Sequence, residues 1–306
     1  MTVPLESVPG IPALALAHAT GGAGAAPFLG EPATAAAIAA RAERVLAAFR
    51  PREGADETLS ELARGRRAGV LAGQQVGLLT GPLLTTVKAL AAVQIARELS
   101  SRGTDLAPVF WCASEDHDLV EVTRISLPGA DGAVEAGPDP APLAGNRRPV
   151  GALPVETVVA AVLDRAREGA GAIADAESLA ALGAAHAGAT YREAFVASLS
   201  WLLDEPALLF ADAARREEKP VLVPLATRLV RERAEVRRLL GDRAAALAAA
   251  GHPPQVVAEG GALPLFALVD GERLLLRERE GALELKGRDG ERYGEQDVVS
   301  RFETGE

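Results

Sequence analysis

Short apolar runs alternate with amphipathic stretches along the first two thirds of the chain. Three runs have the length and the apolar composition of buried strands, and they cover residues 68–72, 107–113 and 205–212. Helical spacing of apolar residues predicts helices over residues 31–49, 57–64 and 83–99. Strands that alternate with helices are typical of a parallel sheet, so the pattern predicts an α/β fold with a sheet flanked by helices.

Smaller pieces are expected within this core, which we predict to be one α/β domain over residues 1–306. They are a loop insertion at 128–147, a helical segment at 155–203, a long helix or helix pair at 221–250 and a small β region at 255–290. Within the β region, Asp270-Gly271 predicts a hairpin turn.

Two finer predictions follow from periodicity. In the helix over 83–99, five residues share one side, which we expect to pack on the sheet: Leu84, Val87, Leu90, Ala91 and Ile95. Residues 119–125 alternate in polarity, which predicts a strand that leads away from the end of the second apolar run.

A glycine-rich turn joins the strand at 68–72, predicted to be central and buried, to the helix that opens after Pro82. Gly73, Gly77 and Gly81 lie in this turn. Backbone N–H groups and the positive end of a helix dipole would meet there, which suits a phosphate or a carboxylate. Further candidate ligand-binding side chains are Gln74, Gln75, Thr80 and Lys88. The spacing matches no standard dinucleotide or P-loop pattern, so a turn that uses glycine only for packing, with Lys88 in solvent, is the alternative.

An acidic cluster follows the second apolar run, at the sheet edge where α/β proteins bind ligands. It consists of Ser114, Glu115, Asp116, His117 and Asp118. Carboxylates and an imidazole suit proton transfer, whereas a solvated acidic loop is the alternative. Consecutive residues at a strand end project alternately, so we expect no metal held by the protein here.

Composition and charge narrow the function. The chain has 306 residues, is 48% hydrophobic and carries a net charge of −10, which argues against nucleic acid as a partner. Cys112 is the only cysteine, lies within an expected strand and is predicted to be a buried, unreactive thiol. The N-terminus lacks a signal peptide and we expect no membrane span, so a cytoplasmic location is predicted.

Several motifs together resemble one family. G-Q-Q-V-G-L-L-T-G-P at 73–82 and P-V-F-W-C-A-S-E-D-H-D at 108–118 are the distinctive ones. Weaker similarities are R-R-P-V-G at 147–151, T-Y-R-E-A-F at 190–195, A-L-L-F-A-D at 207–212 and L-F-A-L-V-D-G-E-R at 265–273. These motifs resemble the BshC family of cysteine-adding enzymes in bacillithiol biosynthesis.

The resemblance implies a Rossmann-like core and a ligase that joins cysteine to glucosaminyl-malate. Amide formation needs an activated carboxylate, and ATP with Mg is the candidate activating pair, but the sequence does not reveal which nucleotide is used, if any. The glycine-rich turn would hold a phosphate or the negative charge of the transition state. His117 would act as the base, while Glu115, Asp116 and Asp118 would hold an ammonium group or orient the imidazole. Asp212 is a further candidate, or else a helix N-cap.

Members of the family are longer than this chain. Their final part carries an R-P-L-x-Q-D stretch, a G-G-P-G-E loop and a coiled coil used for dimerisation, none of which we find before Glu306. Three alternatives follow: a shortened ligase, a nucleotide- or sugar-binding remnant without catalysis, or one subunit of a split ligase that needs a partner chain. A homodimer is a further expected possibility.

Overall fold

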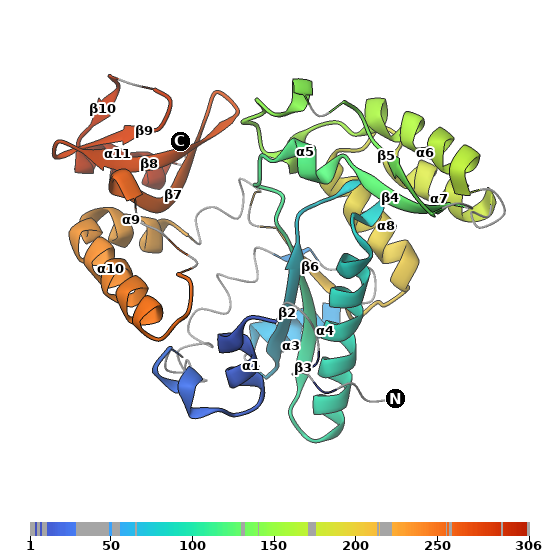
Figure 1. Cartoon of the computed structure of the whole chain (residues 1–306), viewed down its shortest axis with the longest axis horizontal. Coiled ribbons are helices and arrows are strands. Elements are labelled where there is room, and N and C mark those ends of the chain that lie inside the picture. The colour runs from blue at the N-terminus through green and yellow to red at the C-terminus, as the bar shows by residue number, and fades with distance from the viewer. Residues whose placement is uncertain are drawn as a thin grey trace. The chain divides into compact units, whose positions relative to one another are not determined.

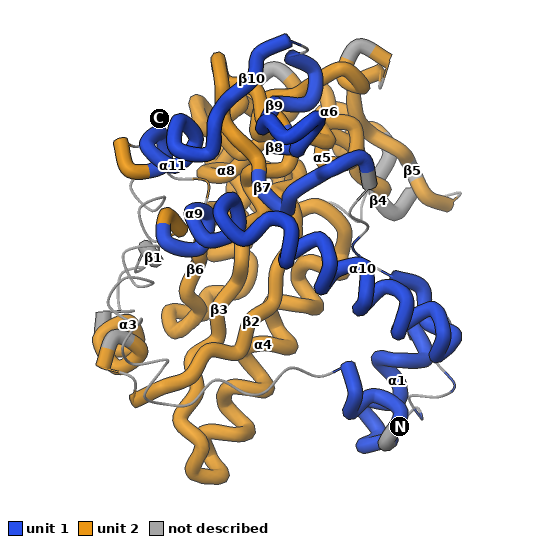
Figure 2. Tube along the Cα trace, turned by 90° about the vertical axis from the view of Figure 1, so that its left-hand side faces the viewer, with its two compact units in different colours: residues 1–34, 224–265, 275–302 blue, residues 35–223, 266–274, 303–306 orange. Residues whose placement is uncertain are grey.

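The structure is a computed structural model of the chain. It describes residues 4, 7, 11–28, 49–50, 56–64, 66–129, 132–139, 141–170, 176–212, 214, 222–254, 256, 259–288 and 290–304. Two compact units are present (Figure 2): residues 1–34, 224–265 and 275–302 make up the first, and residues 35–223, 266–274 and 303–306 the second. Each unit therefore combines segments that are distant in sequence.

A four-stranded sheet forms the centre of the second unit, in the order β1-β6-β3-β2. The strands are β1 (Phe49–Arg50), β2 (Ala68–Gln74), β3 (Leu106–Cys112) and β6 (Leu209–Ala211). β2 and β6 both run parallel to β3, whereas β1 is antiparallel to β6. The prediction of a parallel sheet in an α/β fold is confirmed.

Helices cover both faces of this sheet (Figure 1). The described helices of the second unit are α3 (Asp56–Ala63), α4 (Leu83–Ser101), α5 (Leu119–Val122), α6 (Glu156–Ala170), α7 (Ala176–His186) and α8 (Tyr191–Leu203). On one face, Leu59 and Leu62 of α3 pack against Val109 of β3. On the other, Phe110 of β3 and Phe195 of α8 lie in the main core, their ring centroids 5.9 Å apart.

Short elements complete the second unit. They are the hairpin β4 (Ile125–Gly129) and β5 (Gly132–Ala136) and the helical turns η3 (Leu78–Thr80), η4 (Ala141–Leu143) and η5 (Val150–Ala152). The expected insertion at 128–147 thus includes most of a hairpin, and α6, α7 and α8 all fall within residues 155–203.

The prediction of which face of α4 packs on the sheet is wrong. Leu84, Val87, Leu90 and Ile95 are all more than 40% exposed, and Ala91 is exposed as well. The buried face instead carries small residues, chiefly Ala89, Ala92 and Ala96 together with Thr85 and Val93. Small side chains let a helix approach a sheet closely, and this advantage outweighs the larger apolar area on the opposite side.

Three other predictions need correction or fall outside the described residues. β2 is an edge strand of the described sheet and not a central one, and its Leu71 is 65% exposed. Residues 119–122 form helix α5 and not a strand, because Asp118 caps its N-terminus by accepting a hydrogen bond from the Glu121 N–H. The helix predicted at 31–49 lies outside the described residues, except that Phe49 belongs to β1.

The first unit contains helices and most of a second sheet. Its elements are α1 (Ala13–Ala19), η2 (Ala23–Phe28), α9 (Val223–Arg231), α10 (Arg233–Ala249), η8 (Glu259–Gly261) and α11 (Glu295–Thr304), with strands β7 (Ala262–Val269), β8 (Glu272–Arg279), β9 (Ala282–Leu285) and β10 (Arg292–Tyr293). The sheet order is β10-β9-β8-β7. Asp270 and Gly271, both at positive φ, form the predicted turn between β7 and β8, and this hairpin tip belongs to the second unit.

His186 connects helix α7 to the glycine-rich turn of the second unit. Its side chain is buried, its Nδ1 lies 2.7 Å from the Leu182 carbonyl oxygen, and its Nε2 accepts a hydrogen bond of 3.3 Å from the Leu79 N–H. Leu79 and Thr80 both have positive φ, a conformation that costs energy for residues with a Cβ. The His186 contact therefore stabilises a strained turn.

We expect His186→Leu to lower the stability of the second unit by about 1–3 kcal/mol, because two part-buried backbone groups lose their hydrogen bonds to His186. Burial lowers the pKa of His186, and the hydrogen bond to Leu182 offsets this only in part. The unfolded chain therefore binds the proton more readily, so wild-type stability should be full above about pH 6.5 and fall below it. Urea unfolding at pH 7.5 and 5.5, followed by the fluorescence of Trp111 and Trp201, measures both effects. A wild-type pH dependence that persists unchanged in His186→Leu would contradict the assignment.

Candidate functional site

The predicted site residues meet where β2 and β3 end. Gln74 pairs with Cys112 in the sheet register, and the Ala113 N–H donates to the Gln74 carbonyl oxygen over 2.9 Å. The two motifs that the sequence places 40 residues apart are thereby joined, because parallel strands bring their carboxyl ends to one edge. All residues of this site belong to the second unit.

Gln74 and Gln75 reach different partners. Gln74 accepts a hydrogen bond of 2.7 Å from Lys88 Nζ, which also lies 3.3 Å from the Gly73 carbonyl oxygen. Gln75 donates from Nε2 to Asp116 Oδ2 over 2.7 Å and to Glu121 Oε2 over 2.8 Å. Lys88 is thus half-buried at the end of β2 and not a plain solvent lysine, and Gln75 is the glutamine that contacts the acidic cluster.

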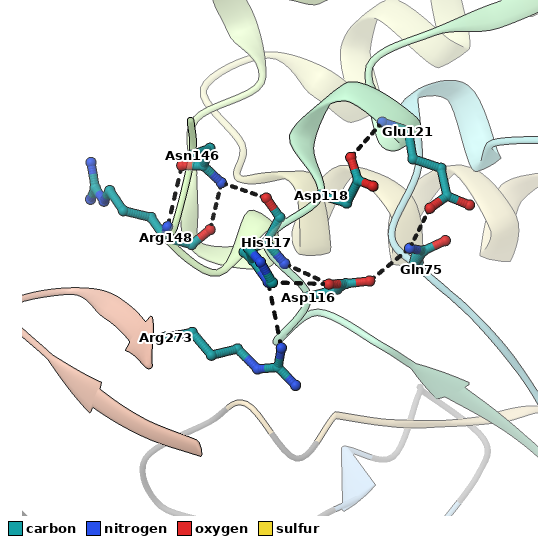
Figure 3. Close-up of polar contacts among 8 residues, drawn as sticks. All are labelled: Gln75, Asp116, His117, Asp118, Glu121, Asn146, Arg148 and Arg273. Carbon is teal, nitrogen blue, oxygen red and sulfur yellow. Dashed lines mark hydrogen bonds and ion pairs between the residues drawn. The ribbon is translucent and has the colours of Figure 1, made fainter. Parts of the chain in front are cut away.

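Asp116 is the centre of the polar contacts (Figure 3). Its Oδ1 accepts a hydrogen bond of 2.7 Å from the His117 N–H, and its Oδ2 accepts from Gln75. Burial by itself would raise the pKa of the Asp116 carboxyl, but the hydrogen bonds from Gln75 and His117, together with the charge of Arg273, outweigh it and lower the pKa. Asp116 is therefore an anion at neutral pH.

His117 lies between an anion and a cation. Its Nδ1 is 3.5 Å from Asp116 Oδ1 and 3.5 Å from Arg273 Nη1 (Figure 3). These contacts require opposite tautomers, because Asp116 accepts a proton from Nδ1 whereas Arg273 donates one to it. In the tautomer that faces Asp116, the lone pair is on Nε2, and this atom can accept a proton.

A neighbouring loop fixes the backbone of the acidic cluster. Asn146 donates from Nδ2 to the carbonyl oxygens of His117 and Arg148, at 2.9 and 2.8 Å. The Val150 N–H donates to the Asp116 carbonyl oxygen over 2.7 Å. Of the predicted carboxylates, Asp118 serves as the cap of α5, so the structure gives it a local role.

Ser114 and Asp212 form a buried cluster beside the site. The Ser114 hydroxyl donates to Asp212 Oδ1, and the other oxygen, Oδ2, lies 3.3 Å from Arg192 Nε without hydrogen-bond geometry. Asp212 also accepts from the Ala214 N–H at 3.0 Å. These contacts join the ends of β3 and β6 and fix Ser114, the first residue of the acidic cluster.

A cavity of about 210 Å³ opens at this edge of the sheet. Its lining consists of Trp111, Cys112, Ala113, Glu115, Asp116 and Arg273. Burial raises the pKa of the Cys112 thiol, and the charge of Asp212 raises it further, so this thiol stays protonated and is no nucleophile. Arg273 was missed in the sequence because it comes from the β7–β8 hairpin, far along the chain.

The three turn glycines contact protein atoms. A Cβ on Gly73 would lie 2.9 Å from the Trp111 carbonyl oxygen, and one on Gly77 would lie 2.8 Å from the Gly81 Cα. The N–H groups of Gly77, Leu79 and Gly81 already donate within the protein, and Thr80 is buried. Packing alone accounts for these residues, and their role in ligand binding stays a prediction.

We expect Gly77→Ala to destabilise the second unit by about 1–3 kcal/mol, because the new methyl group overlaps the backbone at Gly81. Gly145→Ala is the matched control, since its Cβ would have no neighbour within 4 Å. Tryptophan fluorescence during urea unfolding provides the measurement. A Gly77→Ala variant as stable as Gly145→Ala would show that the turn adjusts without cost.

The described residues hold neither a metal-binding group nor a helix suited to a membrane. They contain no group of three or more His, Cys, Asp and Glu side chains arranged to hold a metal ion. Among the helices in those same parts of the chain, none is both long and apolar enough to cross a membrane.

Comparison with known proteins identifies the family. The family model described as the N-terminal Rossmann-like domain of bacillithiol biosynthesis BshC matches residues 32–304. The chain belongs to the BshC family. The Rossmann-like fold expected from the motifs is thereby confirmed.

Curated BshC relatives named "Putative cysteine ligase BshC" support this assignment. The protein from Koribacter versatilis is 35% identical over 224 residues, which cover 72% of this chain and 41% of the relative. The protein from Solibacter usitatus is 32% identical over 254 residues, which cover 80% of this chain and 47% of the relative. The chain therefore spans less than half the length of these two BshC proteins.

Proposed function

We propose that this chain acts as a cysteine ligase, forming an amide bond between the carboxyl group of cysteine and the amine of glucosaminyl-malate. The observation that carries the proposal is the contact of Gln75, Asp116 and His117 at the ends of β2 and β3, in a chain whose relatives are named cysteine ligases. The reaction needs an activated carboxylate and an amine that loses a proton.

His117 Nε2 is the group to which we assign the proton transfer. With Nδ1–H directed to Asp116, Nε2 takes the proton from the attacking amine, and the anionic Asp116 stabilises the imidazolium that forms. Gln75 keeps Asp116 in place through its 2.7 Å hydrogen bond. Glu115 lines the same cavity and supplies a second carboxylate near the reacting groups.

ATP with Mg is the expected source of carboxylate activation. Because the N–H groups of Gly77, Leu79 and Gly81 already have partners, the glycine-rich turn is a poor fit for a phosphate in this arrangement. We assign no step to the nucleotide. Lys88, held at the end of β2, is a cation that could meet its phosphates.

The test is an assay of the purified chain with cysteine, glucosaminyl-malate, ATP and Mg. Mass spectrometry should detect the bacillithiol product, and omission of any one component should abolish it. Absence of product with every component present would contradict ligase activity of the chain on its own.

A split ligase is the second candidate. The chain matches 41–50% of the length of the first three relatives, and in a split ligase a second polypeptide would supply the remainder. This candidate predicts product only when a polypeptide corresponding to the remainder of a relative is added. A ligand-binding protein without catalysis would bind cysteine but form no product in either assay, and size measurement would reveal a homodimer.

A further inference from the structure

Arg273 is held rigidly at the tip of the β7–β8 hairpin. Its backbone N–H donates to the Arg147 carbonyl oxygen over 2.8 Å, and its Cζ lies 3.5 Å from the centroid of the Phe266 ring. A guanidinium stacked on an aromatic ring loses little conformational freedom when it binds a ligand. The side chain is therefore preorganised.

The guanidinium lines the cavity, and no carboxylate of the described residues lies in direct contact with it. Among the described residues, none of the ion pairs within 4.0 Å involves Arg273, and its contact to a side chain by a polar atom is the one to His117 Nδ1 at 3.5 Å. By contrast, other half-buried arginines such as Arg192 and Arg233 pair with carboxylates. A permanently charged group without a fixed counter-ion at a cavity wall is suited to bind an anion.

Asp116 lines the same cavity, is an anion at neutral pH and has a partly exposed side chain. One cation and one anion on the lining of the same small cavity match a ligand that carries both charges. An α-amino acid is such a ligand, with its carboxylate and ammonium groups on a single carbon atom.

We propose that Arg273 binds the carboxylate of an α-amino acid substrate and that Asp116 binds its ammonium group. The inference deepens the proposed function, on which it rests for the identity of the amino acid as cysteine. A carboxylate that engages Arg273 also removes its competition for His117 Nδ1, which favours the tautomer facing Asp116. Substrate binding would thus prepare Nε2 as the base.

Calorimetric titration of the whole chain with three probes tests the proposal. L-cysteine carries both charges, cysteamine lacks the carboxylate, and 3-mercaptopropionate lacks the ammonium group. We expect Arg273→Gln to weaken the binding of L-cysteine and of 3-mercaptopropionate by about 10- to 100-fold, because charge-assisted hydrogen bonds are lost. The binding of cysteamine should not change. Asp116→Asn should weaken the binding of L-cysteine and of cysteamine but not the binding of 3-mercaptopropionate.

Arg148→Gln is the control, because its side chain is exposed on the neighbouring loop, and it should bind all probes as the wild type does. The proposal is overturned if Arg273→Gln binds L-cysteine as tightly as the wild type, if it weakens cysteamine equally, or if the wild type binds none of the probes. L-serine separates this inference from the proposed function: binding equal to that of L-cysteine, with the same dependence on Arg273, would keep the amino-acid site and remove the specificity for cysteine.

Discussion

Replacing His117 with alanine is expected to lower product formation by about 10²- to 10⁴-fold, the usual contribution of a positioned general base. The loss should appear in kcat, because the imidazole acts on the proton that leaves the attacking amine. Asp116→Asn should lower kcat as well, since it removes the charge that stabilises the imidazolium. The mass-spectrometric assay with varied cysteine concentration separates kcat from KM.

The matched control is His18→Ala, since His18 is an exposed histidine of α1 in the first unit. It should leave turnover unchanged. Tryptophan fluorescence should be normal in His117→Ala, because the His117 side chain is partly exposed. Undiminished turnover in a correctly folded His117→Ala protein would remove the base from the proposed mechanism.

Replacing Asp212 with alanine is expected to destabilise the second unit by about 3–5 kcal/mol. The change leaves the Arg192 guanidinium without its anion and leaves the buried Ser114 hydroxyl without its acceptor. Ser114 is the first residue of the acidic cluster, so turnover should fall together with stability. Urea unfolding followed by tryptophan fluorescence is a direct measurement, because Trp111 and Trp201 both lie in this unit.

Asp164→Ala is the matched control for Asp212→Ala. Asp164 pairs with Arg167 at 2.6 Å, but both side chains are more than half exposed. Removal of an exposed ion pair typically costs less than 1 kcal/mol. If the two variants lose similar stability, the buried pair at the end of β6 contributes no more than a surface pair.

The sequence was sufficient for the local elements of the second unit. The apolar runs at 68–72, 107–113 and 205–212 contain or overlap β2, β3 and β6, and the meeting of Gln75 with Asp116 follows from parallel strands alone. The face of α4 was predicted wrongly because large apolar residues were weighted above small ones, whereas close packing favours alanine. The strand at 119–125 was predicted wrongly because Asp118 was considered for chemistry and not as a helix cap.

Arg273 could not be found from local pattern. Only the folded hairpin places this arginine against the acidic cluster. The aromatic residue seven positions earlier, Phe266, was the available signal, since a stacked arginine beside a tight turn is an ordered one. The sequence does not say that the hairpin lies beside the acidic cluster, and without this knowledge the pairing of Phe266 with Arg273 does not indicate a site.

The contact between His117 and Arg273 joins residues 156 positions apart. A ribosome that adds ~5–20 residues per second needs about 8 to 30 s to travel from one to the other. β2, β3 and the glutamine contact can form during that interval, because all their residues have already been made, and the long loop closes afterwards. Arg273 thus reaches the site late in synthesis, and a nascent chain can form its sheet before Arg273 completes the lining of the cavity.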